Sequence, residues 1–458
     1  PYVLAAIPFI FFNFTLPPVR FFFNNIVALG MMFTGKYQFN NLRTSSYMNA
    51  PLAQKESPDQ KATLTIHIPI YRESFEETIR EALESVVQER NDYNMEAAAQ
   101  KANIIVSDDG LLSFTNNKDI DTYIQEALSL PESERTSEQN EVMKRVQFYR
   151  ENNITFVARP WPIQGNAATV RKGTFKKGSN LNYTLRLADR VAEIAQSENI
   201  SESQAQQRAV QEQEIYRLGH IEGTVRVGEM TLLLDKDSIV PTGVSTRISP
   251  EFKADESLAY IQFASYTSNR EDNYFTRIKS YFTDLHYDVE FGFSSLNGAM
   301  VHLVGHNAFI RTQALREHNW WPENRVSEDL SVEIDLYTRG YHGKYGHFTD
   351  MYFKEADTTS IREEARQHTK YLYGVSEIFF NKPSQWRTVG VFTQQIKDFV
   401  RSENVSIYQK IDELLHLGRL YHLTFFAPLL MTAPFFGPIV IGFILPTLLF
   451  TMMGSLVA

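Results

Sequence analysis

The sequence predicts an α/β fold in which a mostly parallel β-sheet is covered by helices on both faces. Short apolar segments suited to strands alternate with amphipathic helical segments along residues 63–380, and this alternation is typical of parallel sheets. In addition, residues 230–234 (MTLLL) form a continuous apolar run that ends in acids. A run of this kind indicates a strand that is buried on both faces.

The expected elements follow one another in a regular order. Their apolar and β-branched residues predict strands over residues 63–69, 103–107, 155–157 and 230–234. Helices are expected over residues 74–88, where Ser74 and Glu77 form a capping box, over 178–195 and around 330–337. Two polar segments, 117–151 and 196–214, are rich in Glu, Gln, Ser and Asn. We interpret them as surface helices inserted into the core.

Both ends of the chain are very apolar. Residues 1–19 and 21–35 carry no charge, and no Asp, Glu, Lys or Arg follows Arg419. Because about 20 apolar residues cross a bilayer, the segment 420–458 is too long for one straight span. A break at PFFGP would leave 439–458 as one crossing, and a buried helix hairpin is the alternative. The sequence therefore predicts a multi-pass integral membrane protein.

The segment just before the apolar tail is amphipathic. A helix over 386–400 would place its apolar residues on one face, and a second helix would follow with Ile407, Ile411, Leu414 and Leu415. Such helices suit a membrane interface, although ordinary core packing gives the same pattern. The expected organisation begins with an N-terminal transmembrane or interfacial segment (residues 1–39) and a linker (40–62). The α/β domain (63–380) follows, then interfacial helices (381–419) and a C-terminal transmembrane region (420–458).

Composition excludes several kinds of protein. The formal net charge is −9, and no long run of Lys and Arg is present, so no nucleic-acid partner is expected. The chain contains no cysteine. Disulfide frameworks and thiolate metal sites are therefore excluded.

Two acidic motifs follow predicted strands. Asp108 and Asp109 belong to SDDG, directly after the strand at 103–107, and Asp235 and Asp237 belong to DKD, after the strand at 230–234. Ligands of parallel sheets bind beyond the carboxyl ends of strands, and carboxylates with diphosphate oxygens suit Mg²⁺. The alternatives are a tight Asp-Gly turn for SDDG, and a helix cap with a turn acid for DKD.

Two further polar motifs lie towards the carboxyl end of the domain. Glu328 and Asp329 open a helix after Ser327, where a cap and first-turn acids stabilise the helix dipole. Asp329 is also a candidate general base that deprotonates an acceptor hydroxyl. The last motif consists of Gln367, Lys370 and Tyr371, which by itself is only a polar helix.

The ordered set of SDDG, DxD, ED and a QxxRW-like motif resembles processive family 2 glycosyltransferases, such as cellulose, chitin and hyaluronan synthases. The resemblance covers about residues 63–374. Shorter segments agree with it, namely PIYRE, FKKGSNLN, which resembles KAGNLN, and GHNAFIR, whose GHNA is most similar to glucan-synthesising members. The sequence around VARP, FKKGSNLNY and KYLYG also resembles that of fungal family 2-like proteins.

The resemblance implies a GT-A (Rossmann-like) catalytic domain and a role for each matching residue. The donor nucleotide would be bound by Tyr71, Glu73, Asp108, Asp109, Lys177, Asn180 and Asp235. Asp235 and Asp237 would hold Mg²⁺ or Mn²⁺, and Asp329, next to Glu328, would be the catalytic base. The acceptor and diphosphate would be bound by His306, Asn307, Gln367, Lys370 and Tyr371. Trp320 and Trp321 would form either a sugar-stacking wall or part of the core.

The function that the resemblance implies is inverting transfer of glucose from UDP-glucose to a growing β-glucan. The catalytic domain would lie on the cytosolic side of a plasma or inner membrane, with a glycan acceptor and the lipid bilayer as partners. Subunits of a membrane complex or a second copy of the chain are further expected partners. One alternative is the transfer of a single sugar from UDP-N-acetylglucosamine or UDP-glucose to a lipid or small acceptor. A second alternative is a catalytically silent membrane scaffold.

The last motif departs from the family pattern. Lys370 and Tyr371 stand where the family has Arg and Trp. Lys keeps the positive charge but lacks the bidentate fork of Arg, and Tyr keeps a flat face for stacking on sugar. The departure bears on product and processivity more than on sugar transfer.

Overall fold

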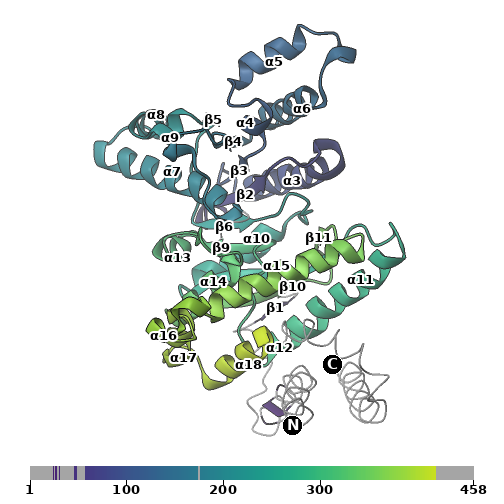
Figure 1. The fold of residues 1–458 in the computed structure, drawn as a ribbon, viewed down its shortest axis with the longest axis vertical. Coiled ribbons are helices and arrows are strands. Elements are labelled where there is room, and N and C mark those ends of the chain that lie inside the picture. The colour runs from purple at the N-terminus through teal and green to yellow at the C-terminus, as the bar shows by residue number, and fades with distance from the viewer. Residues whose placement is uncertain are drawn as a thin grey trace.

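The computed structural model describes residues 57–173 and 176–418, together with residues 24, 26, 27, 30 and 46–48. Its centre is a nine-stranded sheet with helices packed on both faces (Figure 1). The strand order is β1-β10-β7-β9-β6-β2-β3-β4-β5. The strands are β1 (Ser46–Met48), β2 (Leu64–Ile70), β3 (Ala102–Asp108), β4 (Thr155–Ala158), β5 (His220–Glu222), β6 (Met230–Leu233), β7 (Leu258–Phe263), β9 (Ala308–Arg311) and β10 (His342–His347).

The predicted α/β class with a mostly parallel sheet is confirmed. The four predicted strands are β2, β3, β4 and β6, and they pair in parallel in the order β6-β2-β3-β4. Strand β5 is antiparallel at one edge, and β9 runs antiparallel between β6 and β7. The sequence analysis did not predict β9, whose four residues are too few for a clear period-2 pattern.

The reversed direction of β9 brings distant loops together. Ala308, the first residue of β9, pairs with Leu233 at the end of β6 and with Gln262 near the end of β7. The loop that precedes β9 therefore lies at the carboxyl ends of β6 and β7, beside the loops that follow these two strands. Any polar residues in these three loops share one end of the sheet.

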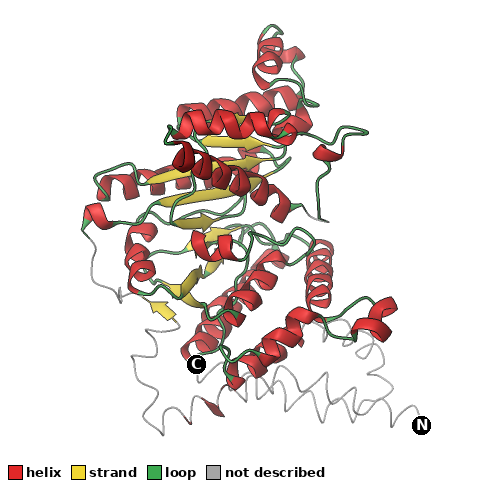
Figure 2. Cartoon of the chain, turned by 90° about the vertical axis from the view of Figure 1, so that its left-hand side faces the viewer, coloured by secondary structure: helices red, strands yellow, loops and turns green. Residues whose placement is uncertain are grey.

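Helices form a layer on each face of the sheet (Figure 2). Alternate residues of β3 face opposite layers, since Ile104 and Val106 belong to one core cluster and Ile105 to another. The first layer contains α3 (Arg80–Glu96), α6 (Ser137–Glu151) and α10 (Val244–Ala254). The second contains α7 (Lys177–Glu198), α8 (Glu202–Glu212), α13 (Thr312–Glu317), α14 (Glu328–Thr338) and α15 (Ile361–Phe379).

The remaining helices are short or peripheral. The predicted helix at 74–88 begins as a π-turn (Phe75–Ile79) that continues into α3, with the Glu77 backbone N–H donating to Ser74 Oγ. The others are α4 (Leu111–Phe114), α5 (Ile120–Leu128), α9 (Glu214–Arg217), α11 (Tyr274–Asp284), α12 (Gly292–Leu296), α16 (Trp386–Val389), α17 (Gln394–Arg401) and α18 (Ile407–Gly418).

The interpretation of residues 117–151 as a surface insertion is wrong for α6. This helix buries Val142, Arg145, Val146 and Tyr149 on one face, and three of them belong to the core cluster around β2 and β3. The polar composition comes from the opposite face of the helix. An amphipathic helix with few large apolar residues was therefore mistaken for a surface element.

The predicted helix over 386–400 is also wrong in its continuity. The chain breaks at Gly390, which has φ 88°, and forms α16 and α17 in place of one helix. Ile396 and Phe399 of α17 are buried in the core, whereas Trp386 and Val389 of α16 are exposed. Ordinary packing thus accounts for α17, and α16 keeps an exposed apolar surface.

The helix α18 packs through polar residues as well as apolar ones. Asp412 and Glu413 are buried, whereas Ile407 is 74% exposed. None of the helices in the described part of the chain combines the length and the apolar character that a membrane crossing requires. The spans predicted within 1–39 and 420–458 lie outside the described residues, apart from the isolated positions given above.

Packing of α15 on the start of α14 depends on a glycine. A Cβ at Gly374 would overlap Ser327 Oγ and would lie 2.9 Å from Ser327 Cβ. We expect Gly374→Ala to lower the free energy of unfolding by about 1–3 kcal/mol, because overpacking forces the helices apart. Denaturant unfolding measures this change. Thr369→Ala, at an exposed position of the same helix, is the control and should change stability by less than about 0.5 kcal/mol.

Candidate active site

The first turn of α7 carries the side chain that joins the predicted motifs. Lys177, the first residue of the helix, donates from Nζ to Asp235 Oδ1 at 2.6 Å and to the backbone oxygen of Gly305 at 2.9 Å. Its pKa is raised although burial opposes the charge, because Asp235, Glu328 and Asp329 surround it with negative charge. Lys177 thus connects three loops that are far apart in sequence.

The DKD motif leaves β6 at the edge of this cluster. Burial favours the neutral form of Asp235, but Lys177 and His306 more than offset it and lower its pKa. The pKa of Asp237 is raised instead, first by burial, with a further contribution from the nearby Asp235 carboxylate. Its Oδ2 lies 3.8 Å from Lys236 Nζ. Two neighbouring carboxylates with opposite pKa shifts are therefore available at the strand end.

His306 lies between two carboxylates. Its Nδ1 is 3.7 Å from Asp235 Oδ2, and its Nε2 forms an ion pair with Glu355. Burial lowers the pKa of the imidazole, but Glu355 and then Asp235 overcome this effect and raise it to about 9. Asn307 is fully buried and donates from Nδ2 to Ser265 Oγ at 2.6 Å. His306 is therefore protonated at neutral pH, and Asn307 is fixed in place.

Glu355 is a site residue that the sequence analysis missed. It ends β11 (Phe353–Glu355), which pairs with β8 (Ser265–Thr267) in a separate two-stranded sheet. Its carboxylate also lies 3.5 Å from Asn307 Nδ2. A single Glu in a three-residue strand carries no pattern that could have marked it.

The candidate base packs directly on the loop that carries His306. A Cβ at Gly305, whose φ is +81°, would lie 2.7 Å from Asp329 Oδ2. The Asp329 Oδ1 atom accepts the backbone N–H of Leu330 at 2.8 Å. Ser327 occupies the cap position of α14, but its side chain makes no cap hydrogen bond. The absence of a side chain at residue 305 is what lets the carboxylate reach this loop.

Both acids of the ED motif have raised pKa values. Burial raises the pKa of Glu328, and the Asp329 carboxylate raises it further. Burial also raises the pKa of Asp329, while Lys177 and Lys370 lower it in part. A carboxylate whose pKa lies nearer to neutrality is a better general base than an ordinary Asp. The electrostatic environment therefore fits the predicted role of Asp329.

The fourth motif reaches the same cluster from α15. Gln367 donates from Nε2 to Tyr371 Oη at 2.7 Å. Burial raises the pKa of Tyr371, and the negative charges of Glu355, Asp329 and Asp235 raise it further. Tyr371 as a whole residue is 40% exposed. Part of its side chain therefore remains accessible.

The SDDG motif forms a second group, linked to the first through α7. Asp109 accepts from Arg159 Nε at 2.7 Å, and Arg159 Nη1 donates to Ser179 Oγ at 3.0 Å. Asn180 donates from Nδ2 to the backbone oxygen of Ser107 at 2.9 Å. The start of α7 is therefore bonded to SDDG on one side and to DKD on the other.

Asp108 is wholly enclosed. Its carboxylate accepts the Gly110 backbone N–H at 2.9 Å, the Tyr149 hydroxyl at 2.9 Å and Arg145 Nη1 at 3.1 Å. Next to it, the Tyr71 backbone N–H donates to Glu73 Oε2 at 2.8 Å, and Tyr71 as a whole residue is 41% exposed. Tyr71 therefore has a surface free to contact a base, whereas Asp108 fixes the surrounding loops.

Comparison with known proteins identifies a family for the carboxyl-terminal part of the chain. Residues 230–457 match the family model described as Glycosyl transferase family group 2. These residues are a family 2 glycosyltransferase domain. The match includes Asp235, Asp237, His306, Asp329 and Lys370, whereas SDDG precedes it. It confirms the prediction of an enzyme of the hexosyltransferase type, and the sheet described above is that of a GT-A fold.

Two solved structures align with this chain at low sequence identity. A mannosyltransferase from Pyrobaculum calidifontis, in complex with GDP-Man and Mn²⁺, aligns with 14% identity and a TM-score of 0.46, covering 97% of this chain and 95% of its own. Mannosyl-3-phosphoglycerate synthase from Rubrobacter xylanophilus aligns with 10% identity and a TM-score of 0.35, covering 74% of this chain and 82% of its own.

The two tryptophans of the glycosyltransferase lie in the core. Trp320 and Trp321 are 4% and 3% exposed and belong to the cluster that contains α14. Trp320 donates from Nε1 to Asp189 Oδ2 at 3.1 Å, and the Trp321 backbone N–H donates to Asn182 Oδ1 at 3.0 Å. Core packing therefore accounts for both residues, and neither ring is placed to stack on a sugar.

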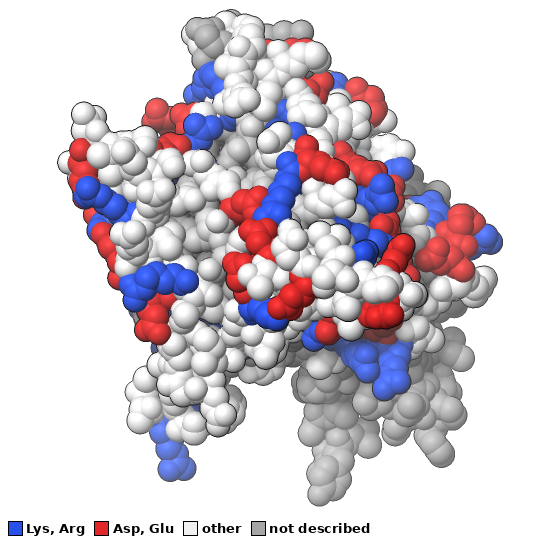
Figure 3. All heavy atoms as spheres, turned by 90° about the horizontal axis from the view of Figure 1, so that it is seen from above, with Lys and Arg blue, Asp and Glu red and all other residues white. Residues whose placement is uncertain are grey.

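Cavities elsewhere on the molecule do not include the predicted residues. One of about 510 Å³ is lined by Asn103 and Thr155 at the amino ends of β3 and β4, and one of about 400 Å³ lies between α8 and β5. Ligands of parallel sheets bind at the carboxyl ends. On the face shown in Figure 3, acidic and basic side chains are interspersed, and no continuous basic patch is visible there.

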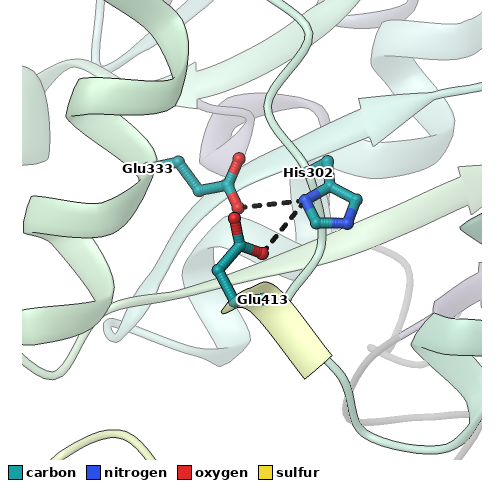
Figure 4. Close-up of side chains that lie close together, drawn as sticks. All are labelled: His302, Glu333 and Glu413. Atoms are coloured by element: carbon teal, nitrogen blue, oxygen red, sulfur yellow. Dashed lines mark hydrogen bonds and ion pairs between the residues drawn. The ribbon is translucent and has the colours of Figure 1, made fainter. Parts of the chain in front are cut away.

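A separate ionisable group lies one helical turn beyond Asp329. Among the described residues, one group of His and acidic side chains has potential metal-ligand atoms that all lie within 4.8 Å of one another. It consists of His302, Glu333 and Glu413 (Figure 4). His302 Nδ1 lies 3.2 Å from Glu333 and 3.4 Å from Glu413. Imidazole and carboxylate groups of this kind can bind a divalent cation. Alternatively, ion pairs between His302 and the two glutamates inside the core explain the same contacts.

The Glu333 carboxyl has a raised pKa, because it is buried and lies near Glu413. A raised pKa in the folded state means that this group destabilises the fold as the pH rises above the ordinary pKa of Glu. We expect wild-type protein to lose at least about 1 kcal/mol more stability between pH 5 and pH 8 than Glu333→Gln does. Denaturant unfolding at both pH values tests this. Glu81→Gln, at an exposed site, should behave like wild type, and equal pH slopes in all three proteins would contradict the prediction.

Proposed function

We propose that this chain is an inverting glycosyltransferase that transfers glucose from UDP-glucose to a growing β-glucan. One observation carries the chemistry of sugar transfer. Lys177 bonds both Asp235 and Gly305, and the Asp329 carboxylate packs on Gly305. These contacts support the assignment of the three groups to one site. Asp235, Gly305 and Asp329 lie within the matched glycosyltransferase residues 230–457, and Lys177 precedes them.

The donor side would be formed by the loops at the start of α7. Tyr71, which is partly exposed, would contact the uracil base, and Lys177, which pairs with Asp235, would contact the diphosphate. The carboxylates of Asp235 and Asp237 are the hard oxygen ligands that Mg²⁺ and Mn²⁺ prefer, and they would hold the cation. When bound, such a cation neutralises the charge that develops on the leaving UDP.

The acceptor would approach from the side of α15. Asp329 would take the proton from the acceptor hydroxyl while the oxygen forms a bond to the anomeric carbon. The bond between that carbon and the diphosphate oxygen breaks on the opposite face, so an α-linked donor gives a β-linked product. The protonated His306 and the partly exposed Tyr371 would contact the acceptor sugar. No carboxylate nucleophile is required, in contrast to retaining hydrolysis.

The identity of the donor rests on the GHNA segment, residues 305–308, which is most similar to glucan-synthesising members. We propose that the chain is an integral membrane protein whose terminal apolar segments anchor the catalytic domain at the cytosolic face. The exposed apolar side chains of α16 and the exposed Ile407 of α18 are consistent with such a location. Lys370 and Tyr371 stand where the family has Arg and Trp, and this departure bears on processivity. Transfer of a single sugar is therefore the alternative to synthesis of a β-glucan.

Replacing the base tests the mechanism. We expect Asp329→Asn to lower kcat at least about 10³-fold while the affinity for UDP stays within about threefold, because the base acts only in the chemical step. Release of UDP from detergent-solubilised protein and calorimetric binding of UDP provide the two readouts. Asp350→Asn, at a distant exposed carboxylate, serves as control. Transfer at the wild-type rate by Asp329→Asn would exclude this residue as the base.

A donor and metal screen tests the substrate. We expect UDP release from UDP-glucose with Mg²⁺ or Mn²⁺, loss of activity with EDTA and recovery on addition of the cation. Asp237→Asn should require at least about tenfold more cation, because one hard ligand is lost. Parallel assays use UDP-N-acetylglucosamine and GDP-mannose, and glycosidase digestion of the product identifies its linkage. Preferential use of another donor would overturn the assignment of glucose, and silence with every donor would support a scaffold.

A further inference from the structure

Arg145 is a large cation enclosed in the core beside the SDDG loop. Its side chain has no exposed surface, and Asp108, its partner, has none either. The guanidinium Nε donates to Glu141 Oε1 at 2.8 Å, and Nη1 donates to both carboxylate oxygens of Asp108 at 3.1 Å. A charged side chain in such a position is retained only when its donors are satisfied.

The remaining donors of Arg145 bond the loop that follows β2. Nη1 also donates to the backbone oxygen of Tyr71 at 2.7 Å, and Nη2 donates to that of Glu73. The carboxylate of Glu141, which orients Arg145, accepts the Phe75 backbone N–H at 2.8 Å as well. One guanidinium and its partner thus bond the main chain at three positions within residues 71–75.

The same loop is pressed against the SDDG turn. A Cβ at Gly110 would lie 2.7 Å from the Tyr71 backbone carbon and 3.0 Å from Arg145 Nη1. The Asp109 backbone N–H donates to the Ile70 oxygen at 2.9 Å. The backbone oxygens of Tyr71 and Glu73 accept from Arg145, and Tyr71 as a residue remains 41% exposed.

We propose that Arg145 is a positioning residue for the donor nucleotide. By holding residues 71–75 against Asp108 it orders the surface on which the base is bound, although it lies behind that surface and does not touch the donor. This inference rests on the proposed function, in which Tyr71 contacts the uracil base. It also gives α6 a role beyond packing, since this helix supplies both Arg145 and the Tyr149 hydroxyl that bonds Asp108.

The test is Arg145→Lys, which keeps the charge and removes the forked donors. We expect the KM for the UDP-sugar to rise about 10- to 100-fold, which corresponds to losing hydrogen bonds worth about 1.4–2.8 kcal/mol. The kcat and the KM for the acceptor should stay within about threefold. Calorimetry with UDP should show the same loss of affinity, and amide hydrogen exchange of residues 71–75 should accelerate.

A matched control separates positioning from stability. Glu251→Gln removes one partner of another buried ion pair, with Lys344 at 2.9 Å, and should lower the Tm without changing the donor KM. If Arg145→Lys does not fold, Glu141→Gln loosens the same loop and should raise the donor KM about threefold.

An unchanged donor KM in a folded Arg145 variant, or unchanged exchange of residues 71–75, would overturn the inference. Failure of the proposed function has a different signature, because the wild-type protein itself would then bind no UDP.

Discussion

The ion pair between Lys177 and Asp235 is the interaction on which the arrangement of the site depends. Its 2.6 Å contact, together with the bond from Lys177 to the Gly305 oxygen, joins the start of α7 to the ends of β6 and the loop before β9. Asp235, Glu328 and Asp329 concentrate negative charge at this point, and Lys177 is the cation that allows them to lie together. A buried group of like charges is costly without such a counter-ion.

Sheet topology explains why these loops meet. Because β9 runs against its neighbours, the residues that precede it lie beside the carboxyl ends of β6 and β7. Gly305 then lets Asp329 approach from α14. The candidate base, the DKD carboxylates and the GHNA loop are therefore neighbours by virtue of one reversed strand and one missing side chain.

The SDDG motif contributes in a less direct way than its position in the sequence suggests. The Asp108 carboxylate accepts hydrogen bonds from Arg145, Tyr149 and the Gly110 N–H. The Asp109 carboxylate accepts hydrogen bonds from Arg159. Both acids thus bond neighbouring loops and side chains of the protein itself. The arginines involved were not predicted, because each depends on a partner that is remote in sequence.

The sequence by itself determined the α/β class, the strands β2, β3, β4 and β6 and the ordered acidic motifs, and the resemblance of these motifs to family 2 glycosyltransferases indicated sugar transfer. These features are local: apolar periodicity, acids after strands and residue types at fixed spacing. Only the tertiary structure decided that Trp320 and Trp321 are core, that α6 is a structural helix, that Glu355 pairs with His306, and that Arg145 bonds Asp108. Each of these depends on contacts between residues far apart in the chain, and burial of that kind leaves no periodic signal in the sequence.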